Sequence, residues 1–195
     1  MREHKDRIPQ YRDKQTGKVW PGYEIVSSLA AVEKARIIET ESFILAGYRM
    51  DMSMNDERTG PLWTQFMKNR QLIPQPVGRD LYSVQVYPDG FDMKGFTNDT
   101  VFTKWAATKV ASAEGLPEGM HSLVIPAGKY AVFTHRGTAA EFGKTAAFIY
   151  GEWLPASGYA LDGRPSFEVM GKDYFGHLDP RSEEDVWVPV RHADI

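Results

Sequence analysis

The stretch IPAGKYAVFTHRG, residues 125–137, decides the fold because it joins a strand to the start of a helix. Its residues alternate from Tyr130 to His135 with the period of two that is typical of a β-strand. The Pro-Ala-Gly sequence at 126–128 interrupts the pattern, so we expect a glycine-assisted bend where the strand begins. Gly137 then turns the chain into the next element.

The same order of elements is predicted in the first half of the chain. SFILAGYRMDM, residues 42–52, predicts a strand with a bulge at Gly47. A helix is predicted to begin at Gly60-Pro61, with Leu62 and Phe66 on its buried face. Two further strands are predicted over 80–90 and 100–112. This half is therefore β-α-β-β.

The second half repeats that order after the strand at 122–137. Thr138 is expected to cap a helix, with Glu141 at the capping-box position. Strands over 165–176 and 184–192 follow. We therefore predict an α+β fold, a tandem βαββ repeat that forms a curved antiparallel sheet with two helices on one face and a cleft between the halves. The predicted organisation is an N-terminal extension, 1–35, and one domain, 36–191, with halves at about 36–115 and 120–191.

Composition excludes several classes of function. The net charge of −3 and the pI near 6 provide no basic face for nucleic acid, so we expect no direct nucleic-acid binding. The chain has no cysteine, which excludes disulfides, thiolate zinc sites and a cysteine nucleophile and fits a cytoplasmic location. No apolar run is long enough to cross a membrane, and the charged N-terminus lacks the apolar core of a signal peptide.

Motifs for the common catalytic and cofactor sites are also missing. Gly128-Lys129 leads into a strand, whereas a phosphate-binding loop leads into a helix. The histidines, at 4, 121, 135, 177 and 192, form no metal-binding pair, and no nucleophile elbow occurs. We expect no metal and no cofactor. General-base chemistry by His135 is less favoured than a role as a polar strand end.

Acidic residues inside predicted elements are the remaining candidates. Glu168 lies between Phe167 and Val169, so it faces away from both; that face is either a cavity or solvent. Glu152, near the end of the second helix, is a weaker candidate. The acidic cluster at 183–185 is interpreted as a solvated loop.

The second half resembles the GyrI-like, or AraC-type, bacterial effector-binding domain family, which includes stand-alone and integron-borne members. IPAGKYAVFTHRG, EWLPASGYALDGRPSFEVMGKDYFG and DVWVPVR resemble three successive parts of the family pattern, and ESFILAGYRM, LYSVQVYP and FTKWAATKV match more loosely. The resemblance covers about residues 36–191. It implies a tandem βαββ fold whose cleft binds amphipathic, often cationic or aromatic, small molecules, including multidrug ligands, between aromatic walls and a buried acid.

On this resemblance, Glu168 falls on the strand glutamate of the family and is the predicted ligand-binding acid. By position, the expected aromatic walls are Tyr82, Trp105, Phe148 and Trp153. Lys109 stands where many relatives carry an acid, so the resemblance does not extend to a second pocket carboxylate at this position.

Three functions fit these features. The favoured hypothesis is a stand-alone effector-binding protein without catalysis, either a monomer or a homodimer. The second is a hydrolase of reactive or strained small molecules, with Glu168 as the catalytic group. The third is a protein-interaction module of the gyrase-inhibitor type.

Overall fold

The structure is a computed structural model that describes residues 35–91 and 95–193. The chain divides into two units, Met1–Ala31 and Val32–Ile195, and the described residues belong to the second. The predicted N-terminal extension lies outside the described residues except for Ala35. Within the described ranges, no helix is long and apolar enough to cross a membrane.

Nine strands lie in the described ranges and form one antiparallel sheet. They are β1 (Arg36–Thr40), β2 (Phe43–Met52), β3 (Pro76–Val86), β4 (Phe102–Val110), β5 (His121–Ile125), β6 (Gly128–Arg136), β7 (Tyr159–Leu161), β8 (Ser166–Met170) and β9 (Glu183–His192). The first helix is α1 (Thr59–Asn69), followed by the 3₁₀ turn η2 (Arg70–Leu72). The second helical segment runs through η4 (Ala139–Glu141), α2 (Phe142–Phe148), the π-helical turn η5 (Ile149–Trp153) and α3 (Leu154–Ala156).

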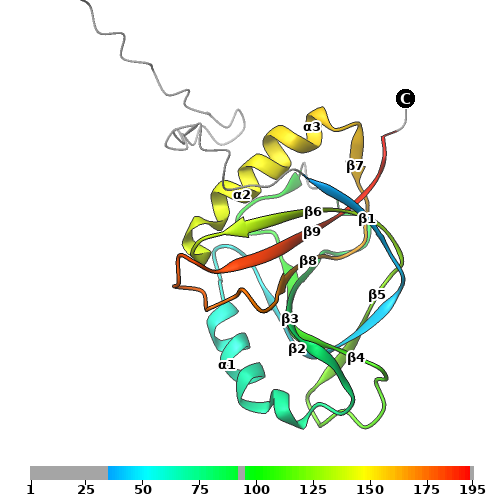
Figure 1. Ribbon diagram of the computed structural model, residues 1–195, viewed down its shortest axis with the longest axis vertical. Helices are drawn as coiled ribbons and strands as arrows, with labels where there is room; N and C mark the ends of the chain where they lie inside the picture. Colours follow the sequence, from blue (N-terminus) through cyan, green and yellow to red (C-terminus); the bar gives the residue numbers. More distant parts are fainter. Residues whose placement is uncertain (1–34, 92–94, 194–195) are drawn as a thin grey trace, which may run out of the picture. The chain divides into compact units, whose positions relative to one another are not determined.

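The strand order is β1-β6-β9-β8-β3-β4-β2-β5, with β7 added on β9 (Figure 1). The element order β2-α1-β3-β4 recurs as β6-α2-β8-β9, so β8 and β3 meet at the centre of the sheet. The predicted curved antiparallel sheet with two helices is confirmed. That the two halves are a tandem repeat of one βαββ unit stays a prediction.

Local patterns explain both helices. Leu62 and Phe66 are the buried residues of α1, as their i, i+4 spacing predicts. At the second helix, the Thr138 backbone N–H donates a hydrogen bond to Glu141 Oε2 at 3.1 Å, which confirms the predicted capping box.

Several predicted strands differ from those observed. The strand predicted over 122–137 is two strands, because Gly128 has a φ of 144° and turns the chain between β5 and β6. The strand predicted over 165–176 ends at Met170. β1 and β7 were not predicted. Gly47 is not a bulge, because the register between β2 and β4 runs without a shift through its pairing with Ala107.

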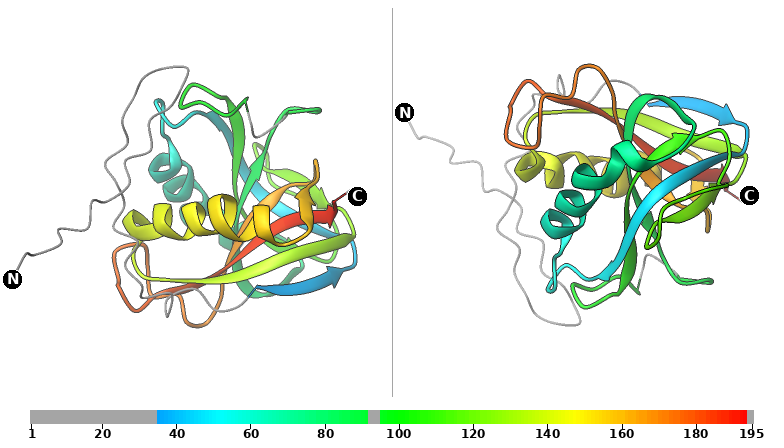
Figure 2. Two further views of the ribbon diagram at one scale, coloured as in Figure 1. Left: turned by 90° about the horizontal axis from the view of Figure 1, so that it is seen from above. Right: turned by 90° about the horizontal axis from the view of Figure 1, so that it is seen from below.

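Both faces of the sheet are covered. One face carries α1 over a core that includes Ala46 and Phe102, and the α2–α3 segment over a second core that includes Phe133 and Val188. Figure 2 shows both helical segments on this side of the strands. The opposite face closes on a third core, formed by eight buried residues: Leu45, Val84, Trp105, Ala107, Ile125, Tyr130, Val132 and Phe167. The cleft described below lies on the helical face.

Candidate ligand-binding cleft

A cleft of about 1960 Å³ lies between α1, the α2–α3 segment and the central strands of the sheet. Ligand pockets commonly measure roughly 300–1,000 Å³, so this cleft has room for a drug-sized molecule and more. Its aromatic lining includes Trp63 on α1, Tyr87 after β3, Phe96, Phe142 on α2, Tyr150 on η5 and Tyr174. Walls of this composition offer apolar faces with a few polar tips.

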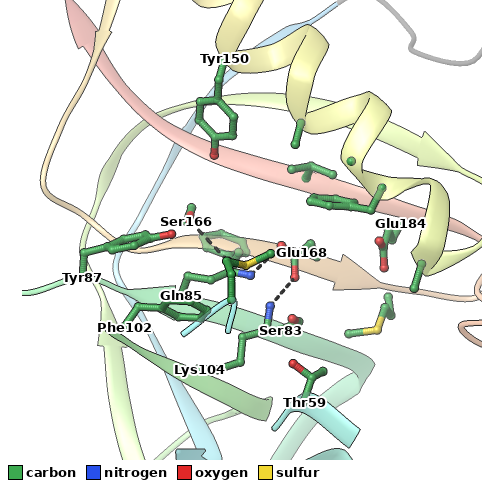
Figure 3. A pocket seen from close by; sticks show the side chains of 18 of the residues that line it. Thr59, Ser83, Gln85, Tyr87, Phe102, Lys104, Tyr150, Ser166, Glu168 and Glu184 are labelled. Carbon is green, nitrogen blue, oxygen red and sulfur yellow. Dashed lines mark hydrogen bonds and ion pairs between the residues drawn. The ribbon is translucent and has the colours of Figure 1, made fainter. Parts of the chain in front are cut away.

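Glu168 occupies the floor of the cleft, where β8 pairs with β3. Gln85 Nε2 donates a hydrogen bond to Glu168 Oε1 at 3.0 Å, and Lys104 Nζ forms an ion pair with Oε2 at 3.4 Å (Figure 3). The Ser166 hydroxyl donates to Gln85 Oε1 at 3.4 Å, which orients the amide. The side chains of Glu168 and Lys104 are each only 11% exposed. The floor therefore carries a buried charge pair held by neutral hydrogen-bonding groups.

Two tyrosine hydroxyls face this charge pair. Tyr150 reaches from the helical segment toward the floor, and Tyr87 approaches from the side (Figure 3). Burial raises the pKa of both phenols, and the negative charge of Glu168 adds to the effect. Both hydroxyls consequently stay protonated at neutral pH and can donate hydrogen bonds to a molecule in the cleft.

A second carboxylate, Glu184 of β9, lines the same cleft. Strand alternation separates it from Glu183, which pairs with Arg136, and from Asp185, which pairs with Arg36. Burial raises the pKa of Glu184 to about 7; repulsion from Glu168 adds to this shift, and Lys104 opposes it. The interpretation of residues 183–185 as a solvated loop was therefore wrong, because they lie in a strand and one of them faces the cleft.

Replacing Glu184 with glutamine should change how stability depends on pH. A carboxyl group with an ordinary pKa of 4.5 that rises to about 7 on folding contributes stability below pH 4.5, and that contribution is lost as the pH rises through 7. We expect the free energy of unfolding of E184Q to equal that of the wild type near pH 4.5. At pH 8 it should be about 2 kcal/mol higher than that of the wild type, a value already reduced for the partial solvent exposure of Glu184. Urea unfolding at both pH values measures the difference, and equal stabilities at pH 8 would contradict the assignment.

Among the five predicted site residues, the structure places Glu168 in the cleft and the four aromatic residues outside its lining. Tyr82 and Trp105 point to the opposite face of the sheet and belong to its core. Tyr82 packs against Phe43, with ring centroids 5.9 Å apart, and Trp105 is 3% exposed. Successive residues of a strand point to opposite faces of the sheet. The neighbours Ser83 and Lys104 therefore face the cleft, and Tyr82 and Trp105 do not.

Phe148 and Trp153 also lie outside the cleft lining, because they form the buried side of the helical segment. Their rings pack edge-on against Phe133 of β6, at centroid distances of 6.4 and 5.1 Å. The aromatic residues of the same segment that line the cleft are Phe142 and Tyr150.

The lysine that lines the cleft is Lys104, which was not among the predicted site residues. Lys109 lies over the ring of Phe43, 4.9 Å from its centroid, on the opposite face of β4. Glu152 is exposed and does not line the cleft. The sequence does show that Lys104 and Trp105 face opposite sides of β4, since successive residues of a strand point to opposite faces of the sheet.

Neither a metal site nor a catalytic histidine emerges from the described ranges. No group of three or more His, Asp or Glu residues there is placed to hold a metal ion. His135 is buried; Thr145 Oγ1 lies 2.8 Å from its Nδ1, and its Nε2 donates to the Thr138 carbonyl at 3.2 Å. Both ring nitrogens thus tie β6 to the second helical segment.

Comparison with known proteins gives matches in both sequence and structure. The family model described as "GyrI-like small molecule binding domain" matches residues 33–191. The transcriptional regulator BrlR of Pseudomonas aeruginosa is 30% identical over 158 residues, which are 80% of this chain. The chain spans 55% of the length of BrlR, so the predicted absence of direct nucleic-acid binding stays a prediction.

Two solved structures share the fold at low sequence identity. SAV2435, solved with bound tetraphenylphosphonium, has a TM-score of 0.63 and 11% identity, over 82% of this chain and 94% of that one. An integron cassette protein from the mobile metagenome of Vibrio cholerae has a TM-score of 0.57 and 17% identity, over 82% of this chain and 97% of that one.

Proposed function

Because the chain belongs to the family of GyrI-like small molecule binding domains, we propose that its cleft binds amphipathic molecules that combine an aromatic body with a positive charge. The observation that carries this proposal is the cleft itself, in which aromatic walls surround a floor that holds Glu168. Aromatic rings attract cations through their faces, by roughly 0.5–2 kcal/mol for each well-placed ring. An organic cation would therefore gain from both the walls and the acidic groups.

Glu168 has a defined part in this proposal. Its carboxylate is fixed by Gln85 and Lys104, so its position does not depend on a ligand. A fixed buried charge sets the electrostatic potential at the floor and interacts strongly with a charge that enters the low-dielectric cleft. That SAV2435, which shares the fold, was solved with a lipophilic cation also supports this choice of ligand class.

The test is a calorimetric titration with tetraphenylphosphonium, compared between two glycine variants. Gly143 on α2 lines the cleft, and its Cβ position is free of neighbours within 4 Å. We expect Gly143→Trp to fill part of the cleft and to weaken binding at least tenfold, a loss of about 1.4 kcal/mol or more. Gly151 on η5 is equally open but does not line the cleft, so Gly151→Trp is the matched control and should bind like the wild type.

Equal weakening in both variants would show that the cation binds elsewhere on the molecule.

The same samples separate binding from hydrolysis and from protein interaction. An electrophilic test compound that is recovered intact by mass spectrometry after long incubation fits binding alone. Consumption of an electrophilic test compound by the wild type, lost in Glu168→Gln, would replace the proposal with hydrolysis. Capture of a protein partner that is unaffected by Gly143→Trp would favour an interaction module.

A further inference from the structure

The two carboxylates of the cleft differ in what they contact. One Glu168 oxygen accepts from Gln85, and the other pairs with Lys104. Within the described ranges, no hydrogen bond or ion pair joins the carboxylate of Glu184 to another side chain. In Figure 3 the Glu184 side chain stands apart from the network that the dashed lines connect. A partly buried carboxylate without a partner is unfavourable, so Glu184 has more to gain from an added cation than Glu168, which already has two partners.

The orientation of Glu184 is set by the strand that carries it. The preceding residue, Glu183, pairs with Arg136 at 3.0 Å, and the following residue, Asp185, pairs with Arg36 at 2.7 Å. Asp185 also accepts a hydrogen bond from the Thr134 hydroxyl at 3.0 Å. These contacts hold both neighbours on the other face of β9, and Glu184 is consequently directed into the cleft.

The groups around Glu184 come from three strands and one connecting segment. On β6, His135 pairs with Glu184 across the two strands, and both of its ring nitrogens already have hydrogen-bond partners. Glu168 on β8 repels the Glu184 carboxylate, and Lys104 on β4 attracts it. In the segment between β8 and β9, Tyr174 interacts electrostatically with Glu184. Lys172, Asp173 and His177 of this segment line the pockets that Glu184 also lines.

We infer that Glu184 is the carboxylate that meets the positive charge of the ligand, and that the ligand displaces a proton from it, while Lys104 keeps the charge of Glu168 balanced. This inference rests on the proposed function and adds the identity of the charged contact. Free Glu184 is about half protonated near neutral pH, because burial raises its pKa to about 7. A bound cation favours the ionised form, so binding is coupled to proton release.

The sign of the pH dependence follows directly. Below pH 6 Glu184 is mostly protonated, and a cation must first displace the proton, so the affinity is low. Above pH 8 the carboxylate is ionised and the affinity is high. If the cation lowers the pKa of this group by one unit or more, the dissociation constant should fall on the order of tenfold between pH 5.5 and pH 8.5.

The experiment titrates wild type and E184Q with tetraphenylphosphonium at pH 5.5, 7 and 8.5. We expect the wild type to gain on the order of tenfold in affinity with pH, and E184Q to bind at every pH about as weakly as the wild type does at pH 5.5. Tetraphenylborate, an anion of the same shape, is the matched probe. Its affinity for the wild type should fall with pH, and E184Q should remove that trend.

The outcomes separate this inference from the proposed function. If the wild type binds tetraphenylphosphonium, and E184Q binds equally well with the same pH dependence, the inference is overturned while the cleft stays a binding site. A pH trend that persists in E184Q assigns the titration to another group and also overturns the inference. If the wild type does not bind the cation at any pH, the ligand class in the proposed function fails.

Discussion

Replacing Gly47 with alanine should lower the free energy of unfolding by about 3 kcal/mol. A Cβ atom at this position would lie 2.1 Å from the Ala106 carbonyl oxygen and 2.7 Å from Ala107 Cα, and both of these are backbone atoms of β4. Contacts this short force strands β2 and β4 apart, and overpacking of a close-packed interior typically costs 1–3 kcal/mol or more. Because β4 also carries Lys104, we expect the floor of the cleft to shift with it.

Gly60 provides the matched control for this substitution. It is the second residue of α1, and its Cβ position has no neighbour within 4 Å. Gly60→Ala should leave stability unchanged or raise it by up to about 1 kcal/mol, through helix propensity alone. Urea unfolding followed by circular dichroism measures both variants. A Gly47→Ala protein that unfolds within 0.5 kcal/mol of Gly60→Ala, on the scale expected for harmless surface changes, would contradict the close approach.

The interpretation of Gly47 shows what sequence patterns leave open. A glycine inside a strand marks either a bulge or a close approach of another backbone, and the sequence favours neither. Pairing decides the matter, and the partner strand, β4, lies more than 50 residues further along the chain. By contrast, the i, i+4 pair Leu62 and Phe66 and the capping pair Thr138 and Glu141 are local features, which is why they were predicted correctly.

The aromatic walls were assigned to the wrong residues for a related reason. Alternation divides a strand into two faces, but it does not say which face carries the helices when both are buried. Tyr82 and Trp105 contribute to a core on the side of the sheet that carries no helix. That core exists because the sheet curves, so that side chains of different strands pack against one another on this face. Their neighbours Ser83 and Lys104 are the cleft residues. Predicting this required the register of β3, β4 and β8, which only the three-dimensional structure supplies.

Glu184 was missed because three consecutive acidic residues are typical of solvated segments. Its neighbours are exposed enough to pair with arginines, and strand alternation gives the middle residue a different environment. Glu168, which lines the cleft, stands alone between apolar residues, a pattern that already predicts two distinct faces; its role as the ligand-binding acid stays a prediction. Isolated charges in strands were therefore more informative here than clustered ones.

Replacing Lys104 with methionine should have opposite effects on stability and on cation binding. The substitution leaves the Glu168 carboxylate, 11% exposed, with Gln85 as its hydrogen-bond donor and without a counter-charge. Breaking a fully buried pair costs about 3–5 kcal/mol, and the open cleft reduces this to roughly 2 kcal/mol in our expectation. At pH 8.5 the affinity for tetraphenylphosphonium should rise on the order of tenfold, because a positive charge leaves the cleft and a second carboxylate becomes available.

Two variants make this result specific to the ion pair. Lys109→Met removes a lysine of the same strand that faces Phe43 on the opposite side, so it should change stability by about 1 kcal/mol or less and leave binding unchanged. The double variant Lys104→Met/Glu168→Gln removes both charges and should recover most of the lost stability, together with wild-type affinity for the cation or less.

Lys104 also lowers the pKa of Glu184, so the pH at which cation binding strengthens should move upward in Lys104→Met. Unchanged cation affinity in Lys104→Met would mean that the ligand does not sense the floor of the cleft, and binding would then have to be assigned to its rim.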